Sequence, residues 1–141
     1  EGRPELRVLD FDKDTTEFAQ FSIAMPKSWN EGTITFEAYW TAASGSGGCS
    51  WGLQGVAVSN DDVIASAFGT AVVVDDTLIA ANDLHISPTS SAITIAGTPA
   101  AGDLCFFQIF RDHDDSNDTL SADARLIGIK IHYTTEAGTD D

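Results

Sequence analysis

Residues 21–51 constrain the fold of this chain more than any other segment. They read as a strand, a turn from Pro26 to Gly32, a long strand and a Gly/Ser-rich hairpin loop. Within the long strand, from Thr33 to Thr41, apolar and polar side chains alternate with a period of two, which is typical of a half-buried strand. The segment therefore predicts antiparallel β-sheet, and it contains no recognisable catalytic or nucleotide-binding motif.

Short strand-like segments continue along the chain, and Gly and Pro residues separate them. One short helix is expected over Asp61–Phe68, because Ser59 or Asn60 can cap it and its apolar residues have i,i+4 spacing. With no βαβ pattern, we expect an all-β fold: an antiparallel β-sandwich, jelly-roll-like, with that one helix. A single domain over residues 1–141 is expected, with frayed ends at 1–5 and 136–141. The expected strands are residues 6–11, 18–25, 33–41, 50–59, 70–74, 83–87, 92–96, 104–110 and 125–135.

The charge balance of the chain is strongly acidic. Asp and Glu number 22 against 7 Lys and Arg, which gives a formal net charge of −15. Such a surface repels phosphate backbones, and the basic residues are scattered along the sequence, so no nucleic-acid partner is expected. No apolar run is long enough for membrane insertion. Most acids fall in expected turns, where the Asp side chain bonds the nearby backbone, so we interpret them as turn formers that aid solubility.

Two acidic segments raise the alternative of a divalent-cation site. Residues 10–14 (DFDKD) imitate the first ligands of a calcium loop, but Thr15 and Phe21 stand where that loop needs Gly and Glu. The segment from Asp112 to Asp118 is a second oxygen cluster, which we interpret as an exposed acidic turn. Neither a metal site nor a cofactor is expected.

The chain has two cysteines, Cys49 and Cys105, too few for a disulfide framework. A bridge between them is one alternative. Because Cys105 lies inside an apolar run, where a free cysteine acts as a small hydrophobic residue, we expect two buried thiols instead.

No residue is expected to be catalytic. The sequence has no G-x-S-x-G elbow and no recognisable triad order, and each histidine (His85, His113 and His132) is interpreted as structural or superficial. A glycosidase pair of carboxylates cannot be singled out among so many acids. The sequence therefore favours a protein that is not an enzyme.

Four aromatic residues could supply a stacking platform for a sugar. Trp40 and Trp51 follow the inward parity of their strands, so we expect them in the core. Trp29, in the expected turn, is the best candidate for an exposed aromatic residue, and Tyr39, on the polar face of its strand, is the next. Trp29 and Tyr39 are therefore the candidate ligand-binding residues.

Two runs resemble a protein family. The first comprises Met25–Phe36 (MPKSWNEGTITF), Tyr39–Ala42 (YWTA), a Gly/Ser loop and Trp51–Leu53 (WGL), and it is similar to a motif of virion structural proteins of tailed bacteriophages. The second, Asp118–Tyr133, resembles the closing segment of the same modules. The resemblance implies a β-sandwich module in a fibre, spike or tail of a phage or phage-like gene transfer agent. It implies location on the virion and contact with other virion proteins, and it transfers no catalytic residue.

One strand bears on self-association. Leu104–Phe110 is apolar on both faces, whereas an antiparallel sandwich strand usually shows one face to water. Either a loop or helix covers its second face or another subunit does. Together with the resemblance, this strand predicts a homo-oligomer, most simply a trimer.

Three function classes follow. The first is a non-enzymatic virion component for assembly or attachment, with a bacterial surface polysaccharide as its target. The second is a cellular carbohydrate-binding module of a secreted enzyme. The third is a glycan depolymerase, which would need paired carboxylates in a cleft.

Overall fold

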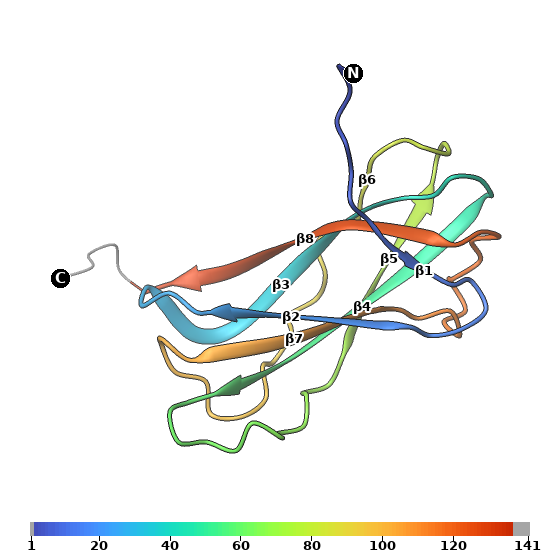
Figure 1. Ribbon diagram of the computed structural model, residues 1–141. Helices are drawn as coiled ribbons and strands as arrows, with labels where there is room; N and C mark the ends of the chain where they lie inside the picture. Colours follow the sequence, from blue (N-terminus) through green and yellow to red (C-terminus); the bar gives the residue numbers. More distant parts are fainter. Residues whose placement is uncertain (1, 137–141) are drawn as a thin grey trace.

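The structure of the protein is a computed structural model that describes residues 2–136. It contains two four-stranded antiparallel sheets that pack face to face (Figure 1), so the expectation of an all-β sandwich is confirmed. One sheet has the strand order β1-β8-β3-β6 and the other has the order β2-β7-β4-β5. The strands are β1 (Leu9–Phe11), β2 (Phe18–Ala24), β3 (Trp29–Thr41), β4 (Gly47–Val58), β5 (Val72–Leu78), β6 (His85–Ile86), β7 (Leu104–Arg111) and β8 (Ala124–Thr135).

The core lies between the sheets, and alternation in strands of both sheets supplies its side chains. In β3, Ile34, Phe36, Ala38 and Trp40 are all buried, and the residues between them are partly exposed. β7 supplies Cys105, Phe107 and Ile109 from the opposite sheet in the same way. These side chains belong to one hydrophobic cluster, so both sheets share a single core.

The expected helix over Asp61–Phe68 is wrong, because between residues 2 and 136 the structure has no helix. Asp61 adopts a left-handed φ of 69°, which interrupts a helix at its start. Val63 and Ile64, the apolar residues of the supposed buried face, are 73% and 77% exposed. With no surface to pack on, so short a segment cannot offset the cost of helix nucleation.

One long side of the sandwich is closed by a segment that we call the strap, residues 87–96. It runs along the free edge of β3, where Ser87 and Ser90 each make a pair of hydrogen bonds. Ser87 N donates to Ala38 O at 2.9 Å, and Ala38 N donates to Ser87 Oγ at 2.8 Å. Ser90 makes the same two contacts with Phe36, at 2.9 and 3.0 Å. The serine hydroxyls therefore accept the backbone hydrogen bonds that the carbonyl groups of a neighbouring strand would otherwise accept.

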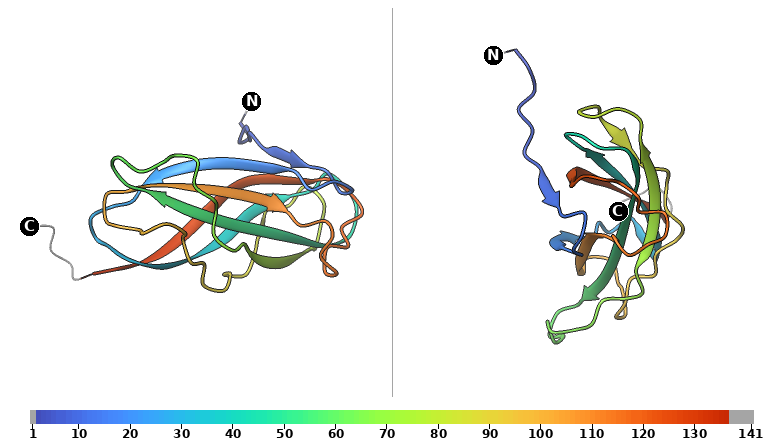
Figure 2. Two further views of the ribbon diagram at one scale, coloured as in Figure 1. Left: turned by 90° about the horizontal axis from the view of Figure 1, so that it is seen from below. Right: turned by 90° about the vertical axis from the view of Figure 1, so that its right-hand side faces the viewer.

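The strap then crosses to the other sheet. Ile93 forms a bridge with Ile34 of β3, and Ala96 forms one with Val56 of β4, beyond the point where β5 stops pairing. The strand expected at 92–96 is therefore present only as two isolated bridges. Figure 2 shows that the two sheets come together on this side.

Candidate binding groove

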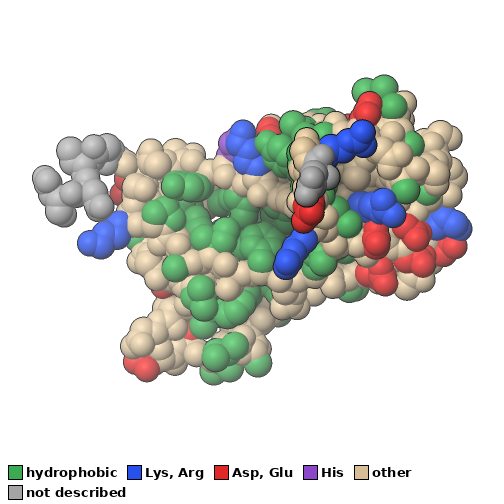
Figure 3. Space-filling view, turned by 45° about the horizontal axis from the view of Figure 1, so that its top comes forward, with side chains coloured by type: hydrophobic (Ala, Val, Ile, Leu, Met, Phe, Trp, Pro, Cys, Tyr) green, Lys and Arg blue, Asp and Glu red, His purple; other side chains and the backbone are tan. Residues whose placement is uncertain are grey.

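The opposite long side of the sandwich is open. There an apolar groove of about 560 Å³ runs between β2 and β8. Its walls are Ala19, Phe21 and Ile23 of β2 and Ile129, Ile131 and Tyr133 of β8. Figure 3 shows it as a hollow among hydrophobic side chains beside the N-terminal segment. Most of these wall residues point toward the core but remain half-exposed, because no described element covers them from the groove side.

The groove is open because β1 is short. β1 pairs with β8 over only three positions and stops at Leu9, opposite Leu126. At the next residues of β8, Ile127 and Gly128, the register against β3 shifts, which marks a β-bulge. A bulge bends its strand and disrupts the ladder, so the chain before Leu9 does not follow β8 further. The strand expected over 6–11 is therefore shorter than predicted.

Two strand edges border the groove. Past the bulge, residues 129–135 of β8 pair only with β3, and β2 pairs only with β7, among the residues that the structure describes. Each strand therefore presents a row of backbone N–H and C=O groups to solvent, beside half-exposed apolar side chains. An edge of this kind is a template for the addition of another strand.

The chain before β1 is the third component of this region. Residues 2–8, which we call the arm, lie outside any strand. Arg7 and Val8 border the groove, and the N-terminal part of the arm extends away from the body (Figures 1 and 2). Leu6 is 60% exposed, and Leu9, at the end of the groove, is 52% exposed. Of the ends expected to fray, residues 2–5 belong to this exposed arm, and residues 1 and 137–141 lie outside the described residues. Glu136 N donates a 2.9 Å hydrogen bond to Ser28 O, so the described end of the chain is held there.

The expected exposure of Trp29 is wrong, because only 1% of it is accessible. Trp29 N donates to Pro26 O at 3.0 Å, so the predicted turn forms, but β3 begins at Trp29 itself. Between Trp29 and Ile34 the register against β8 shifts, and Glu31 adopts a positive φ of 62°. This irregularity turns both Trp29 and Ile34 inward although their numbers differ in parity. A fully buried indole cannot stack on a sugar.

The other three aromatic residues lie where the sequence predicted. Trp40 and Trp51 are fully buried, with ring centroids 6.2 Å apart. Tyr39 lies on the outer face of β3, half-exposed, and pairs with Ile86 of β6 on one side and Gly128 of β8 on the other. The structure therefore separates Trp29 and Tyr39, the two candidate ligand-binding residues, onto different faces.

The outer apolar face of β7 is covered in part by side chains of neighbouring strands. Phe110 lies directly over Gly52 of β4, where an added Cβ would come within 2.3 Å of the ring. Phe18 of β2 packs against Phe110 with ring centroids 5.4 Å apart. The glycine thus allows a large aromatic side chain to lie flat on the sheet, and this lowers its exposure without a covering loop.

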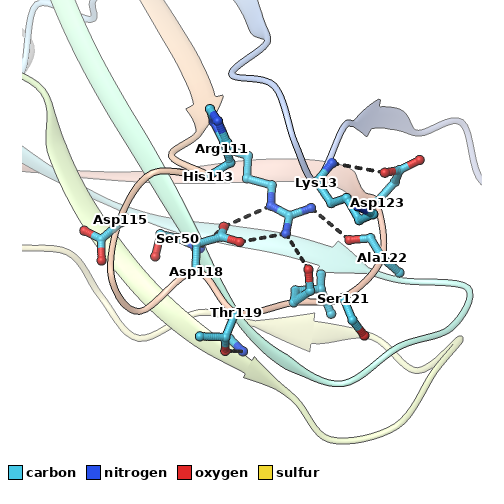
Figure 4. Close-up of polar contacts among 12 residues, drawn as sticks. Lys13, Ser50, Arg111, His113, Asp115, Asp118, Thr119, Ser121, Ala122 and Asp123 are labelled. Atoms are coloured by element: carbon cyan, nitrogen blue, oxygen red, sulfur yellow. Dashed lines mark hydrogen bonds and ion pairs between the residues drawn. The ribbon is translucent and has the colours of Figure 1, made fainter.

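A buried ion pair holds the acidic loop after β7 (Figure 4). Arg111 Nε and Nη2 donate to the two carboxylate oxygens of Asp118, at 2.9 and 2.7 Å. Its remaining donors reach Ala122 O and Leu120 O, and Asp118 Oδ2 also accepts from Ser50 N at 3.0 Å. Both charged side chains are nearly inaccessible, at 0% and 2%. Asp118 is therefore committed to a structural role.

In the acidic loop, His113 lies between a hydroxyl group and a carboxylate, as the histidine of a catalytic triad does. His113 Nδ1 lies 2.7 Å from Thr16 Oγ1, and His113 Nε2 lies 3.2 Å from Asp114 Oδ1. This is a hydroxyl–imidazole–carboxylate line that the sequence did not suggest. Asp114 is 85% exposed, so the carboxylate cannot orient the ring as a buried one does. We interpret the line as a contact between two loops.

The described residues contain no group of three or more His, Cys, Asp or Glu side chains that could hold a metal ion. The acidic loop instead bonds itself: Asn117 N donates to Asp115 Oδ1 at 2.8 Å. Burial, followed by the neighbouring charges of Asp115 and Asp114, raises the pKa of Asp112.

Cys49 and Cys105 are both buried and free. Cys105 pairs with Ala57 of β4, and Cys49 lies eight positions earlier on that same strand, about 26 Å away at 3.3 Å per residue. A disulfide needs Cα atoms within about 7 Å, so the two cannot be bridged in this fold. Burial raises the pKa of Cys105 to about 11 and raises that of Cys49 further.

Comparison with known protein families, with curated proteins and with solved structures finds no match to the chain. In the described part of the chain, no helix is long and apolar enough to cross a membrane.

Proposed function

We propose that this protein is a non-enzymatic structural component of a phage or phage-like particle, in a fibre, spike or tail. The observation that carries the assembly role is the apolar groove with an unpaired strand edge on each side. The particle setting rests on the resemblance of Met25–Phe36 and Asp118–Tyr133 to virion modules. Self-association into a closed oligomer, most simply a trimer, and contact with other virion proteins belong to this proposal.

The groove suits an extended polypeptide. Its apolar walls are spaced two residues apart along β2 and β8, which is the spacing of side chains on one face of a strand. The backbone edges beside it supply the hydrogen bonds of β-augmentation, and the apolar walls supply pockets for alternate side chains. Both features favour a protein partner over a compact small molecule.

We also propose that the sandwich is a jelly roll. Eight strands divide equally between two sheets. Consecutive strands lie in opposite sheets at every connection except the one from β4 to β5. This distribution is typical of a jelly roll, which has eight strands in two sheets.

The assembly role is tested by a matched pair of variants on β2. Ile23 faces the groove, and its neighbour Ser22 is exposed on the outer face. We expect Ile23→Asp to be lost from particles purified from the native source, while Ser22→Asp is incorporated. Electron microscopy with an antibody against the chain locates the protein on the particle. A chain found only outside particles would refute the virion role.

Attachment to a host polysaccharide is a second proposed function, and Tyr39 is the residue that supports it. The ring is half-exposed, and an added Cβ at the neighbouring Gly128 would meet no atom within 4 Å, so the surface beside the ring is open. A glycan array with the wild type and Tyr39→Ala tests this function. We expect the variant to lose binding, because a sugar stacks on the face of the aromatic ring. Equal binding by both would exclude Tyr39. Turnover of a bound glycan would favour the depolymerase instead.

A further inference from the structure

We propose that the groove of each copy takes the arm of a second copy, which pairs as an added strand with the edge of β8 beyond the bulge. The proposal rests on the proposed assembly function and names its partner. The occupant is residues 2–8 of another molecule of this chain, in extended conformation between β8 and β2.

The arm has the pattern of a half-buried strand. Pro4, Leu6 and Val8 fall on one face of an extended chain, and the charged residues fall on the other. In the single molecule Val8 is half-buried at the border of the groove, whereas Leu6 is 60% exposed. The groove presents apolar side chains with the same spacing, Ile129, Ile131 and Tyr133, so the two patterns match. The charged face of the arm consists of Arg3, Glu5 and Arg7.

Residues 2–8 are long enough to pair along this edge. Extended, they span about 23 Å at 3.3 Å per residue. Residues 129–135 of β8, which pair only with β3 in the described part of the chain, are also seven residues. The arm can therefore reach along the open edge.

The arm of the same molecule is poorly placed to fill this edge. The β1–β8 ladder ends at Leu9 and Leu126, immediately before the bulge at Ile127 and Gly128. There the chain turns away from the body, as Figures 1 and 2 show. To continue along its own β8 the arm would have to cross the disrupted step of the ladder. A second molecule can instead approach beyond the bulge.

Charge favours the exchange. The arm carries two of the seven basic residues of the chain, Arg3 and Arg7, and one of its 22 acids, Glu5. The rest of the molecule carries the acidic excess. Docking the arm brings positive charge to an acidic partner and offsets part of the repulsion between two copies.

The first experiment measures self-association of the full chain by sedimentation velocity. Leu6→Ser/Val8→Ser changes the apolar face of the arm and leaves its charge unchanged, and Glu5→Gln changes only its charged face. We expect the apolar-face variant to associate at least about tenfold more weakly than the wild type, because two buried apolar contacts are lost. Glu5→Gln should associate at least as tightly as the wild type, because it removes the only acid of the arm and keeps the apolar face. Both variants should fold, because these residues lie outside every strand and outside the buried core.

The groove variants separate this proposal from the assembly function itself. If Ile23→Asp and the arm variant both dissociate the oligomer, the arm exchange is supported. If Ile23→Asp dissociates it and the arm variant does not, the groove binds something other than the arm and this proposal fails alone. A wild type that stays monomeric at every concentration overturns the arm exchange, whereas the assembly function is decided by incorporation into particles.

A cross-linking experiment distinguishes exchange from closure within one molecule. Leu6→Cys is mixed with Ile129→Cys, Ile131→Cys or Tyr133→Cys, one of the two being labelled with ¹⁵N, and oxidised glutathione is added. A disulfide between labelled and unlabelled chains at one of these positions supports the exchange. The absence of a mixed disulfide at all three positions overturns it. The native Cys49 and Cys105 are buried and do not compete.

Discussion

The indole Nε1 of Trp40 donates a 2.8 Å hydrogen bond to Oδ2 of Asp76. Trp40 belongs to β3 and Asp76 to β5, so this bond joins the two sheets across the core. The same ring packs on His85 at 5.1 Å and on Trp51 at 6.2 Å. Trp51 differs in one respect: its Nε1 is buried without a hydrogen-bond partner among the described residues.

This difference between the two tryptophans can be measured. Asp76→Ala should lower the free energy of unfolding by about 1–3 kcal/mol, because it leaves a buried indole N–H unpaired. Trp40→Phe should cost more than Trp51→Phe, since only the first substitution breaks a bond. Urea denaturation followed by circular dichroism provides the values. Asp83→Ala, at an exposed position, is the control and should change little.

The pair of Arg111 and Asp118 should be essential for stability. Arg111→Met leaves the Asp118 carboxylate buried without its counter-charge, and we expect a loss of about 3–5 kcal/mol. Arg125→Ala breaks an exposed pair with Asp10 and should cost at most about 1 kcal/mol. Equal losses in chemical denaturation for the two variants would contradict the assigned burial of the Arg111 pair.

Any side chain at Gly52 should lower stability while Phe110 is present. Gly52→Ala places a Cβ 2.3 Å from the Phe110 ring, so the ring must move, at a cost of about 1–3 kcal/mol. In Phe110→Ala the obstacle is absent, and adding Gly52→Ala should then cost much less. A double-mutant cycle measures this coupling. Additive losses would show that the two residues do not contact each other.

The Cys105 thiol should make stability fall at alkaline pH. Burial raises its pKa from 9.0 to about 11, so the folded state retains the proton longer than the unfolded state does. Its contribution is fully present below pH 9.0 and is lost as the pH rises toward 11. The difference in unfolding free energy between the wild type and Cys105→Ala should therefore narrow over this range. A constant difference would show that Cys105 does not titrate as assigned.

Much of the fold followed from alternation. The period-two pattern of Thr33–Thr41 identified the inward side chains of β3, and Trp40 lies where that pattern placed it. Strand and turn chemistry act locally, so they can be read from neighbouring residues. Trp29 shows the limit: a bulge at Glu31 reverses parity, and nothing local in the sequence marks it.

The groove could not be derived in the same way, because it depends on which strands are neighbours. Two signals were nevertheless present: the alternation of Pro4, Leu6 and Val8, and the isoleucine-rich start of β8. The alternation of Pro4, Leu6 and Val8 was divided between the expected frayed end at residues 1–5 and the expected strand at residues 6–11. The helix over Asp61–Phe68 failed for the converse reason, since its spacing was correct but the fold offered it no surface.

The serine hydroxyls of the strap have a consequence for uncontrolled aggregation. Ser87 and Ser90 occupy the β3 donors at Ala38 and Phe36, so this stretch of β3 offers no template to an incoming chain. A strand could add to this stretch of β3 only after the strap had detached, so the two serines protect it against edge-to-edge aggregation.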